Sequence, residues 1–234
     1  MPLFSAVSKR SKAALPSAAS DATGGLGSGT RRRILEVGLH MFATRGFAAT
    51  SVRDLANALE LQPSALYAHF KSKEHVLAEL ARYGYEAHEA AIRSAVDAAP
   101  ADPVARMRAF ARAHSLVHAA YPHLAVVVNE ELQGLPEELA RPALAIRQTS
   151  TALLLRLIED GIAAGVFVPT NTMVAAAAIG AMGLRVPYWF TPGESLDAEE
   201  LADLQATLAL RMLGTKENDL EPARPRITKG RRGS

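Results

Sequence analysis

Between residues 30 and 214, apolar residues recur every three or four positions, and no segment alternates apolar and polar residues with a period of two. This spacing places apolar side chains along one face of a helix, whereas a half-buried strand needs a period of two. Aromatic residues are sparse, so the core must consist mainly of Ala, Leu and Val, which favours closely packed helices. We therefore expect an all-α protein.

Turn signals divide this stretch into three short helices followed by longer ones. Ser51 and Asp54 form a capping-box pattern, and Pro63 fits the first position of the next helix. Thr30 and Ser72 are expected N-caps. The expected helices span about 30–46, 51–59, 63–70, 72–98, 103–119, 122–132, 136–164, 171–190 and 196–213.

Several classes of protein are excluded or disfavoured by composition. The absence of cysteine excludes disulfides, zinc–thiolate sites and cysteine nucleophiles, and it suits the cytoplasm. The longest apolar run, residues 173–184, is shorter than the roughly 20 residues that span a bilayer, and no signal peptide is visible. Enzyme motifs such as a Gly-rich phosphate loop, G-x-S-x-G or H-E-x-x-H are missing. We expect a cytoplasmic protein that is not an enzyme, with no catalytic residue, no cofactor and no membrane partner.

The charge is distributed unevenly along the chain. Residues 1–75 carry ten Lys and Arg against five Asp and Glu, whereas residues 76–214 carry ten against sixteen. A basic front joined to an acidic body suggests that the front contacts a polyanion. We predict a disordered basic arm (1–29), a helix-turn-helix domain (30–76), a helical ligand-binding and dimerisation domain (77–214) and a flexible basic tail (215–234).

Three short helices with tight turns are typical of a helix-turn-helix module, whose third helix lies in the DNA major groove. Gln62, Ser64 and Ala65, at the start of that helix, are expected to contact base edges. The expected phosphate contacts are Thr50, Arg53, Tyr67, His69 and Lys73. Two alternatives stay open: the Tyr67 ring packs in the core with its hydroxyl outside, or His69 is an ordinary surface histidine.

Residues 31–77, "RRRILEVGLHMFATRGFAATSVRDLANALELQPSALYAHFKSKEHVL", resemble the DNA-binding domain of the TetR family of bacterial repressors. The resemblance implies a homodimer on a palindromic operator and a C-terminal helical domain with an inducer pocket. The sequence departs from the family pattern at Glu60, which stands where Gly is usual, at Gln62 and at Gly38. Glu60 is expected to adopt a left-handed conformation at a cost of roughly 1 kcal/mol, and Gly38 is expected to cost about as much within its helix.

The body shows two patterns that could bind a ligand. His114 and His118 lie four residues apart on one helix face, but no acidic motif accompanies them, so we assign no metal site and expect histidines that line a cavity. Arg185 and Trp189 are also four apart, a spacing that suits phosphate binding by the guanidinium and base stacking by the indole. Pro187, between them, is expected to kink the helix.

The segment "LRVPYWFTPGESLDAEELADLQATLALRMLG" (184–214) resembles the C-terminal segment of TetR regulators that sense acyl-CoA thioesters. This resemblance implies that Arg185 and Trp189 contact the CoA portion of such an effector. The alternative is that Trp189 anchors a dimer interface with Arg185 as its ion-pair partner. The few aromatic residues ahead of position 188 favour an aliphatic pocket suited to an acyl chain or an alicyclic skeleton.

Two surfaces of the last helices predict the homodimer. Small residues at Ala176, Gly180 and Gly183 permit close helix approach. Along one face of the last helix lie the apolar residues Leu201, Leu204, Leu208 and Met212, which can pair across a two-fold axis. We therefore predict a ligand-responsive transcriptional repressor that releases its operator DNA when a small apolar effector, best an acyl-CoA thioester, binds the body. The alternatives are an acyl-CoA or small-molecule binding protein without operator function, and a helical enzyme with an unrecognised site.

Overall fold

The computed structural model describes residues 29–194 and 196–216, so nearly all of the predicted basic arm and tail lies outside the described residues. Within these residues the chain is all-α, as predicted, and contains no strand. None of the described helices is both long and apolar enough for a membrane span. The elements are α2 (Thr30–Arg45), α3 (Val52–Ala58), α4 (Pro63–Tyr67), α5 (Lys73–Ala98), α6 (Pro103–Ala120), α7 (Pro122–Glu131), the 3-10 helix η2 (Leu132–Gly134), α8 (Glu137–Ala163), α9 (Thr172–Trp189) and α10 (Ala198–Met212).

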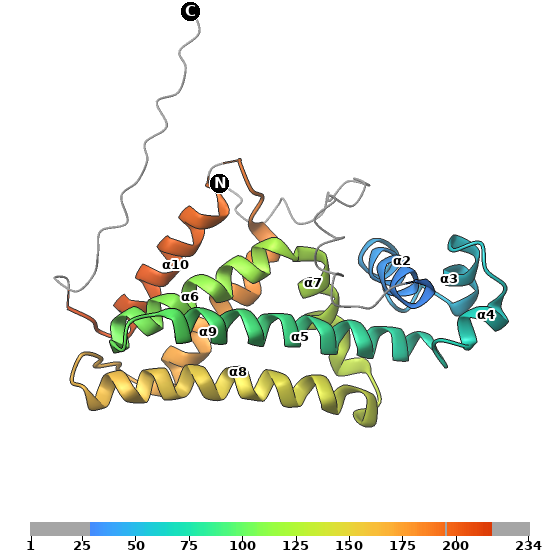
Figure 1. Cartoon of the computed structure of the whole chain (residues 1–234). Helices are drawn as coiled ribbons and strands as arrows, with labels where there is room; N and C mark the ends of the chain where they lie inside the picture. Colours follow the sequence, from blue (N-terminus) through green and yellow to red (C-terminus); the bar gives the residue numbers. More distant parts are fainter. Residues whose placement is uncertain (1–28, 195, 217–234) are drawn as a thin grey trace, which may run out of the picture.

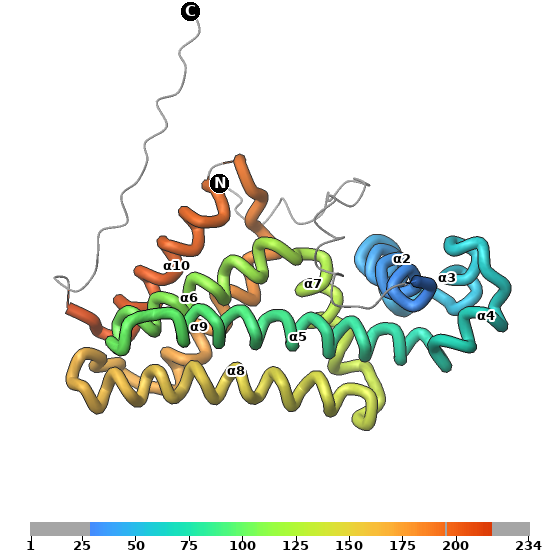
Figure 2. The backbone as a smooth tube through the Cα atoms, viewed as in Figure 1, coloured from blue at the N-terminus to red at the C-terminus, as the bar shows by residue number. Residues whose placement is uncertain are grey.

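The three short helices α2, α3 and α4 form a head at one end of the molecule (Figure 1). The long helix α5 starts at the head and runs through the remaining helices, which form the body, with α8 alongside it. Figure 2 traces how the chain leaves the head once, at the start of α5, and does not return to it through any other loop between the described helices. The domain boundary predicted at residue 76 therefore falls inside one continuous helix.

Local sequence signals explain the turns of the head. The Ser51 hydroxyl accepts a hydrogen bond from the Asp54 N–H, and the Asp54 carboxylate accepts one from the Ser51 N–H, so the predicted capping box is formed. Pro63 occupies the start of α4 as predicted, and Glu60 takes the left-handed conformation expected of it, with φ 56°. Two expected boundaries differ. Gly29, not Thr30, is the N-cap of α2, and α4 ends at Tyr67 because the chain then enters a turn.

The core of the head continues into the body. Buried Leu35, Leu55 and Leu66 belong to one apolar cluster with the first turns of α5, with α7 and with the start of α8. Gly38 explains how closely α2 and α5 approach, because a Cβ atom at this position would lie 2.8 Å from Cγ1 of the buried Val76. This glycine, expected only to weaken α2, therefore makes room for α5.

A second apolar cluster holds α5, α6, α8, α9 and α10 together. The closest packing is at Gly161 of α8, where a Cβ atom would lie 1.9 Å from Cδ2 of the buried Phe167. Polar contacts join α6 to α10: the buried Ser115 hydroxyl donates to Gln205 Oε1 at 2.5 Å, and Arg112 forms ion pairs with Glu199 and Asp203. Because α6 also packs against α5, α8 and α9, it is the central helix of the body.

Candidate nucleic-acid interface and internal cavity

The short helix α4 exposes one face to solvent and buries the other. Leu66 is fully buried and Phe70 nearly so, and these two side chains hold α4 against the rest of the head. The other predicted contacts of this stretch are all exposed: Gln62, Ser64, Ala65, Tyr67 and His69. The Tyr67 side chain is 53% exposed, so its ring is not in the core. The stretch from Tyr67 to His69 is therefore accessible to a macromolecular partner.

Four of the predicted phosphate-contacting residues border one shallow groove between α3, α4 and the start of α5. Thr50, Arg53, Tyr67 and Lys73 all line it. The Arg53 side chain is exposed, but Thr50 is buried, and its hydroxyl donates to the Gly46 carbonyl at 2.9 Å. The groove thus brings together residues from three elements, although the Thr50 side chain faces inward.

Lys73 has structural contacts of its own within the head. Its ammonium donates to the Phe47 carbonyl at 2.7 Å and lies 4.4 Å from the centroid of the Phe47 ring. These contacts tie the first turn of α5 to the loop that follows α2. A phosphate role for Lys73 remains a prediction, and this second role was not visible in the sequence.

Arg31 likewise connects α2 with α5 and with the residues that follow α4. Its guanidinium donates to the His69 carbonyl at 3.0 Å, pairs with Glu79 of α5 and lies 4.3 Å from the centroid of the Phe70 ring. The end of α4 is therefore held by α2 and α5 together. This arrangement fixes the orientation of the exposed face of α4 relative to the body.

The body contains a partly open cavity of about 410 Å³ between α5, α6, α7, α8 and α9. Its walls are mostly apolar, and among the described residues its lining includes one cationic arginine, Arg147, and no Asp or Glu. The Tyr85 hydroxyl forms a hydrogen bond with Arg147, and burial raises the pKa of Tyr85 while the guanidinium lowers it. Ser150, also in the lining, has a buried hydroxyl without a hydrogen-bond partner. The cavity therefore suits an apolar molecule with few polar atoms.

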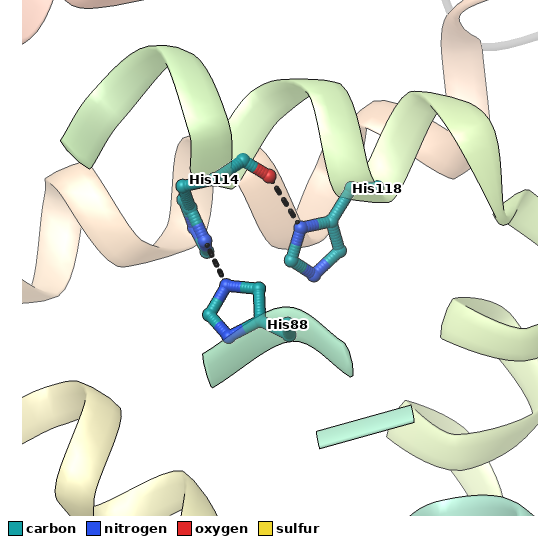
Figure 3. A group of neighbouring side chains, drawn as sticks. All are labelled: His88, His114 and His118. Atoms are coloured by element: carbon teal, nitrogen blue, oxygen red, sulfur yellow. Dashed lines mark hydrogen bonds between the residues drawn. The ribbon is translucent and has the colours of Figure 1, made fainter. Parts of the chain in front are cut away.

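Three histidines meet in the wall of this cavity: His88 of α5 and the predicted lining residues His114 and His118 of α6 (Figure 3). His88 Nε2 lies 2.8 Å from His114 Nδ1, and His118 Nδ1 lies 2.7 Å from the His114 carbonyl. Burial lowers the pKa of His88 to about 4, with a smaller effect from His118, and burial also lowers the pKa values of His114 and His118. All three imidazoles are therefore neutral at pH 7.

Arg185 and Trp189 lie at the end of α9, outside the lining of the cavity. Arg185 is exposed, with its guanidinium 4.1 Å from the centroid of the Tyr188 ring. Trp189 is 56% exposed and packs edge-on against Phe190. Pro187 is buried, and α9 continues through it to Trp189. Both residues lie in the last turns of α9, as expected. The sequence analysis missed His88, Tyr85, Arg147 and Ser150 as lining residues.

A three-helix head with an exposed third helix, joined by one long helix to a hollow helical body, defines a helix-turn-helix regulator with a ligand-binding domain. Comparisons agree with this class. Residues 34–80 match the family described as "Bacterial regulatory proteins, tetR family", and residues 100–213 match "Tetracyclin repressor-like, C-terminal domain". The chain belongs to the TetR family of bacterial transcriptional regulators.

The similar proteins include transcriptional regulators of this family. The chain is 30% identical over 201 residues to the HTH-type transcriptional repressor KstR2 of Mycobacterium tuberculosis, covering 84% of this chain and 98% of that protein. A TetR-family regulatory protein from Rhodococcus has a similar structure, with a TM-score of 0.74 at 31% identity, over 87% of this chain and all of that chain. AibR, solved in complex with isovaleryl coenzyme A and operator DNA, has a TM-score of 0.70 at 25% identity, over 79% of this chain and 98% of that chain.

Proposed function

We propose that the protein is a ligand-responsive repressor that binds a palindromic operator as a homodimer and releases it when an acyl-CoA thioester occupies the body. The observation that carries this proposal is the exposed face of α4, which presents Gln62, Ser64 and Ala65 beside the phosphate-contact candidates Tyr67 and His69. Two such helices, about 34 Å apart in successive major grooves, would read the two half-sites of an operator.

Exposed apolar residues on α10 support the homodimer. Of the predicted stripe, Leu201 is buried within the chain, whereas Leu204, Leu208 and Met212 are 41%, 48% and 37% exposed. These three residues recur every four positions and so share one face of the helix. An apolar face of this kind is covered when two copies pack together around a two-fold axis. The small residues of α9 contribute differently, since Gly183 is buried against His114 of the same chain.

Two elements can connect the cavity with the head. Gly84 and His88 of α5 line the cavity, and the first turns of the same helix pack in the core of the head. Leu124 and Val128 of α7 line the cavity as well and belong to that same core. A molecule that displaces α7 or α5 therefore changes the position of the head. By linkage, it weakens operator binding only if it binds the released arrangement more tightly.

The shape and polarity of the body support an acyl thioester as the effector. The cavity is apolar but not, as expected, purely aliphatic, because Tyr83, Tyr85, Phe110 and Tyr121 also line it. It would hold the acyl group, and Leu184 of α9 lines it one residue before Arg185. Arg185 and Trp189 lie outside, where a phosphate-bearing nucleotide can remain in solvent. AibR, a structural neighbour, was solved with isovaleryl coenzyme A, which adds support for this class of ligand.

Operator binding is tested by fluorescence anisotropy with the DNA that flanks the protein's own gene. Replacing Gln62 by alanine should weaken binding to that DNA about 5- to 150-fold, because a side chain that pairs with a base contributes about 1–3 kcal/mol. The control Gln133→Ala removes the same chemical group from an exposed position of η2, outside the three helices of the head, and should bind normally. Failure of the wild-type protein to bind any flanking fragment would contradict the proposal.

The effector is tested by native mass spectrometry against acyl-CoA thioesters of different chain lengths and ring content. At least one thioester should bind the protein and should release the DNA. Arg185→Ala should weaken binding of that thioester about tenfold or more, since the charged phosphate contact is lost. Arg156→Ala, an exposed arginine of α8, is the matched control. Thioester binding without any DNA binding would instead favour the alternative of a binding protein without operator function.

A further inference from the structure

The three histidines of the cavity wall are arranged as ligands of a metal ion. We propose that His88, His114 and His118 form a binding site for a divalent transition-metal ion, with Zn²⁺, Co²⁺ and Ni²⁺ as the candidates. One ligand nitrogen of each side chain lies within 4.8 Å of the corresponding nitrogens of the other two. A metal ion with bonds of about 2.0–2.1 Å to imidazole nitrogen fits between nitrogens at such separations after small side-chain shifts.

Backbone carbonyl groups already orient two of the three rings. His114 Nε2 lies 2.9 Å from the Gly180 carbonyl, which leaves Nδ1 of that ring directed toward His88. His118 Nδ1 lies 2.7 Å from the His114 carbonyl, which leaves Nε2 as its ligand atom. Metal-bound histidines usually donate their second ring N–H to a carbonyl or carboxylate in this way, because the contact fixes both the tautomer and the ring orientation.

The hydrogen bonds of the cluster also define the tautomers of His114 and His88. With the His114 proton held on Nε2 by Gly180, the short contact between His88 and His114 requires His88 Nε2 to carry the proton. To hold a metal ion, His88 would need the other tautomer, with its proton on Nδ1 and the Nε2 lone pair free as a ligand.

The composition of the site selects the kind of ion. Among the described lining residues of the cavity there is no Asp or Glu, and the chain has no cysteine. Hard ions such as Mg²⁺ and Ca²⁺ prefer oxygen ligands, whereas imidazole suits Zn²⁺, Ni²⁺ and related ions. Three protein ligands would leave at least one position of a tetrahedral ion open, and all three histidines line the cavity. The site would thus place a Lewis acid beside the occupant of the cavity.

Gly183 of α9 has a role in this arrangement. A Cβ atom at this position would lie 2.3 Å from both Cδ2 and Nε2 of the His114 ring. A glycine is therefore required where α9 passes the ring. Replacing Gly183 by alanine should displace the His114 ring while all three histidines remain in the chain.

The test uses full-length protein without a histidine tag, freed of metal with EDTA and titrated with Co²⁺ at pH 7. The proposal expects one Co²⁺ per chain and the intense visible absorption of a tetrahedral ion, with displacement of Co²⁺ by Zn²⁺. His88→Ala should weaken Co²⁺ binding by more than about 100-fold, since loss of a ligand exceeds the usual 10–100-fold effect of an outer contact. Gly183→Ala should weaken it by about 10–100-fold through ring orientation.

Two controls make the outcome decisive. His40→Ala removes a half-buried histidine from α2, outside the cavity, and should leave the Co²⁺ titration unchanged. Circular dichroism confirms that each variant is folded. Absence of stoichiometric Co²⁺ binding by the folded wild-type protein would overturn the proposal whatever the variants do, as would undiminished binding by His88→Ala. Operator binding is measured separately by fluorescence anisotropy, so a failure of Co²⁺ binding is distinguishable from a failure of the proposed function.

Discussion

The head and the body place their polar residues in opposite ways. The head packs Leu35, Leu55 and Leu66 into a filled core and presents its polar side chains on the outside of α4. The body surrounds a hollow and places imidazole and hydroxyl groups inside it. The difference indicates that the head is shaped for the surface of a large partner, whereas the body is shaped for a small molecule that it encloses.

The same difference explains which regions can move. The exposed face of α4 is held by Arg31 and by buried Phe70, so it keeps one orientation. The cavity wall is less tightly packed, because a volume of about 410 Å³ lacks protein atoms that would support its lining. A rigidly held DNA-contact surface joined to a less tightly packed body is the arrangement that a ligand-controlled DNA-binding protein needs.

Among these variants, Phe70→Ala is expected to cause the largest loss of stability, and the loss should be concentrated in the head. Phe70 is 3% exposed, and removing its ring from the filled core of the head should lower stability by about 3–5 kcal/mol. Hydrogen exchange followed by mass spectrometry should show faster exchange of amides in α3 and α4, with little change in α9 and α10. Tyr67→Ala, which removes a half-exposed ring three residues earlier, should cost far less. Equal destabilisation of α10 would show that the two regions are not distinct.

Gly161→Ala tests the packed part of the body. The added Cβ atom would lie 1.9 Å from the buried Phe167 ring, so the variant should lose about 2–3 kcal/mol of stability through overpacking. Gly180→Ala is the matched control, because nothing lies within 4 Å of its added Cβ atom. This control should be neutral or stabilising by up to about 1 kcal/mol, since alanine favours a helix over glycine. Urea denaturation measures both variants, and equal stability of the two would contradict the packing described for α8.

Lys73→Ala gives the smallest expected effect and separates its structural role from a DNA role. Loss of the hydrogen bond to the Phe47 carbonyl and of the contact with the Phe47 ring should lower the stability of the DNA-free protein by about 1–2 kcal/mol. Lys71→Ala, an exposed lysine two residues earlier, should change stability by no more than about 0.5 kcal/mol. Thermal unfolding without DNA measures both. If Lys73→Ala is as stable as Lys71→Ala, only the phosphate role is left for Lys73.

Much of the head could be predicted from the sequence because its signals are local. The capping box at Ser51, the proline at the start of α4 and the left-handed Glu60 each depend on residues within a few positions of one another. The contacts formed by Arg31 and Lys73 could not be predicted, because their partners lie 38 and 26 residues away in the chain. Gly38 was misread for the same reason, since its close neighbour Val76 belongs to another helix.

In the body, the spacing of His114 and His118 correctly indicated a shared helix face in the cavity wall. His88 carries no such signal, because only the packing of α5 against α6 brings it to the other two rings, 26 residues from His114. Likewise, the spacing of Arg185 and Trp189 indicates that they lie near one another, but nothing in it shows that they remain outside the cavity.

The sequence by itself determined the helical class, the turns of the head and the exposed face of α4, because periodicity and capping act between residues that are close along the chain. Only the tertiary structure decided which side chains meet inside the body. Helices pack through residues far apart in sequence, and the position of each ring depends on gaps left by others, such as the one that Gly183 leaves for His114.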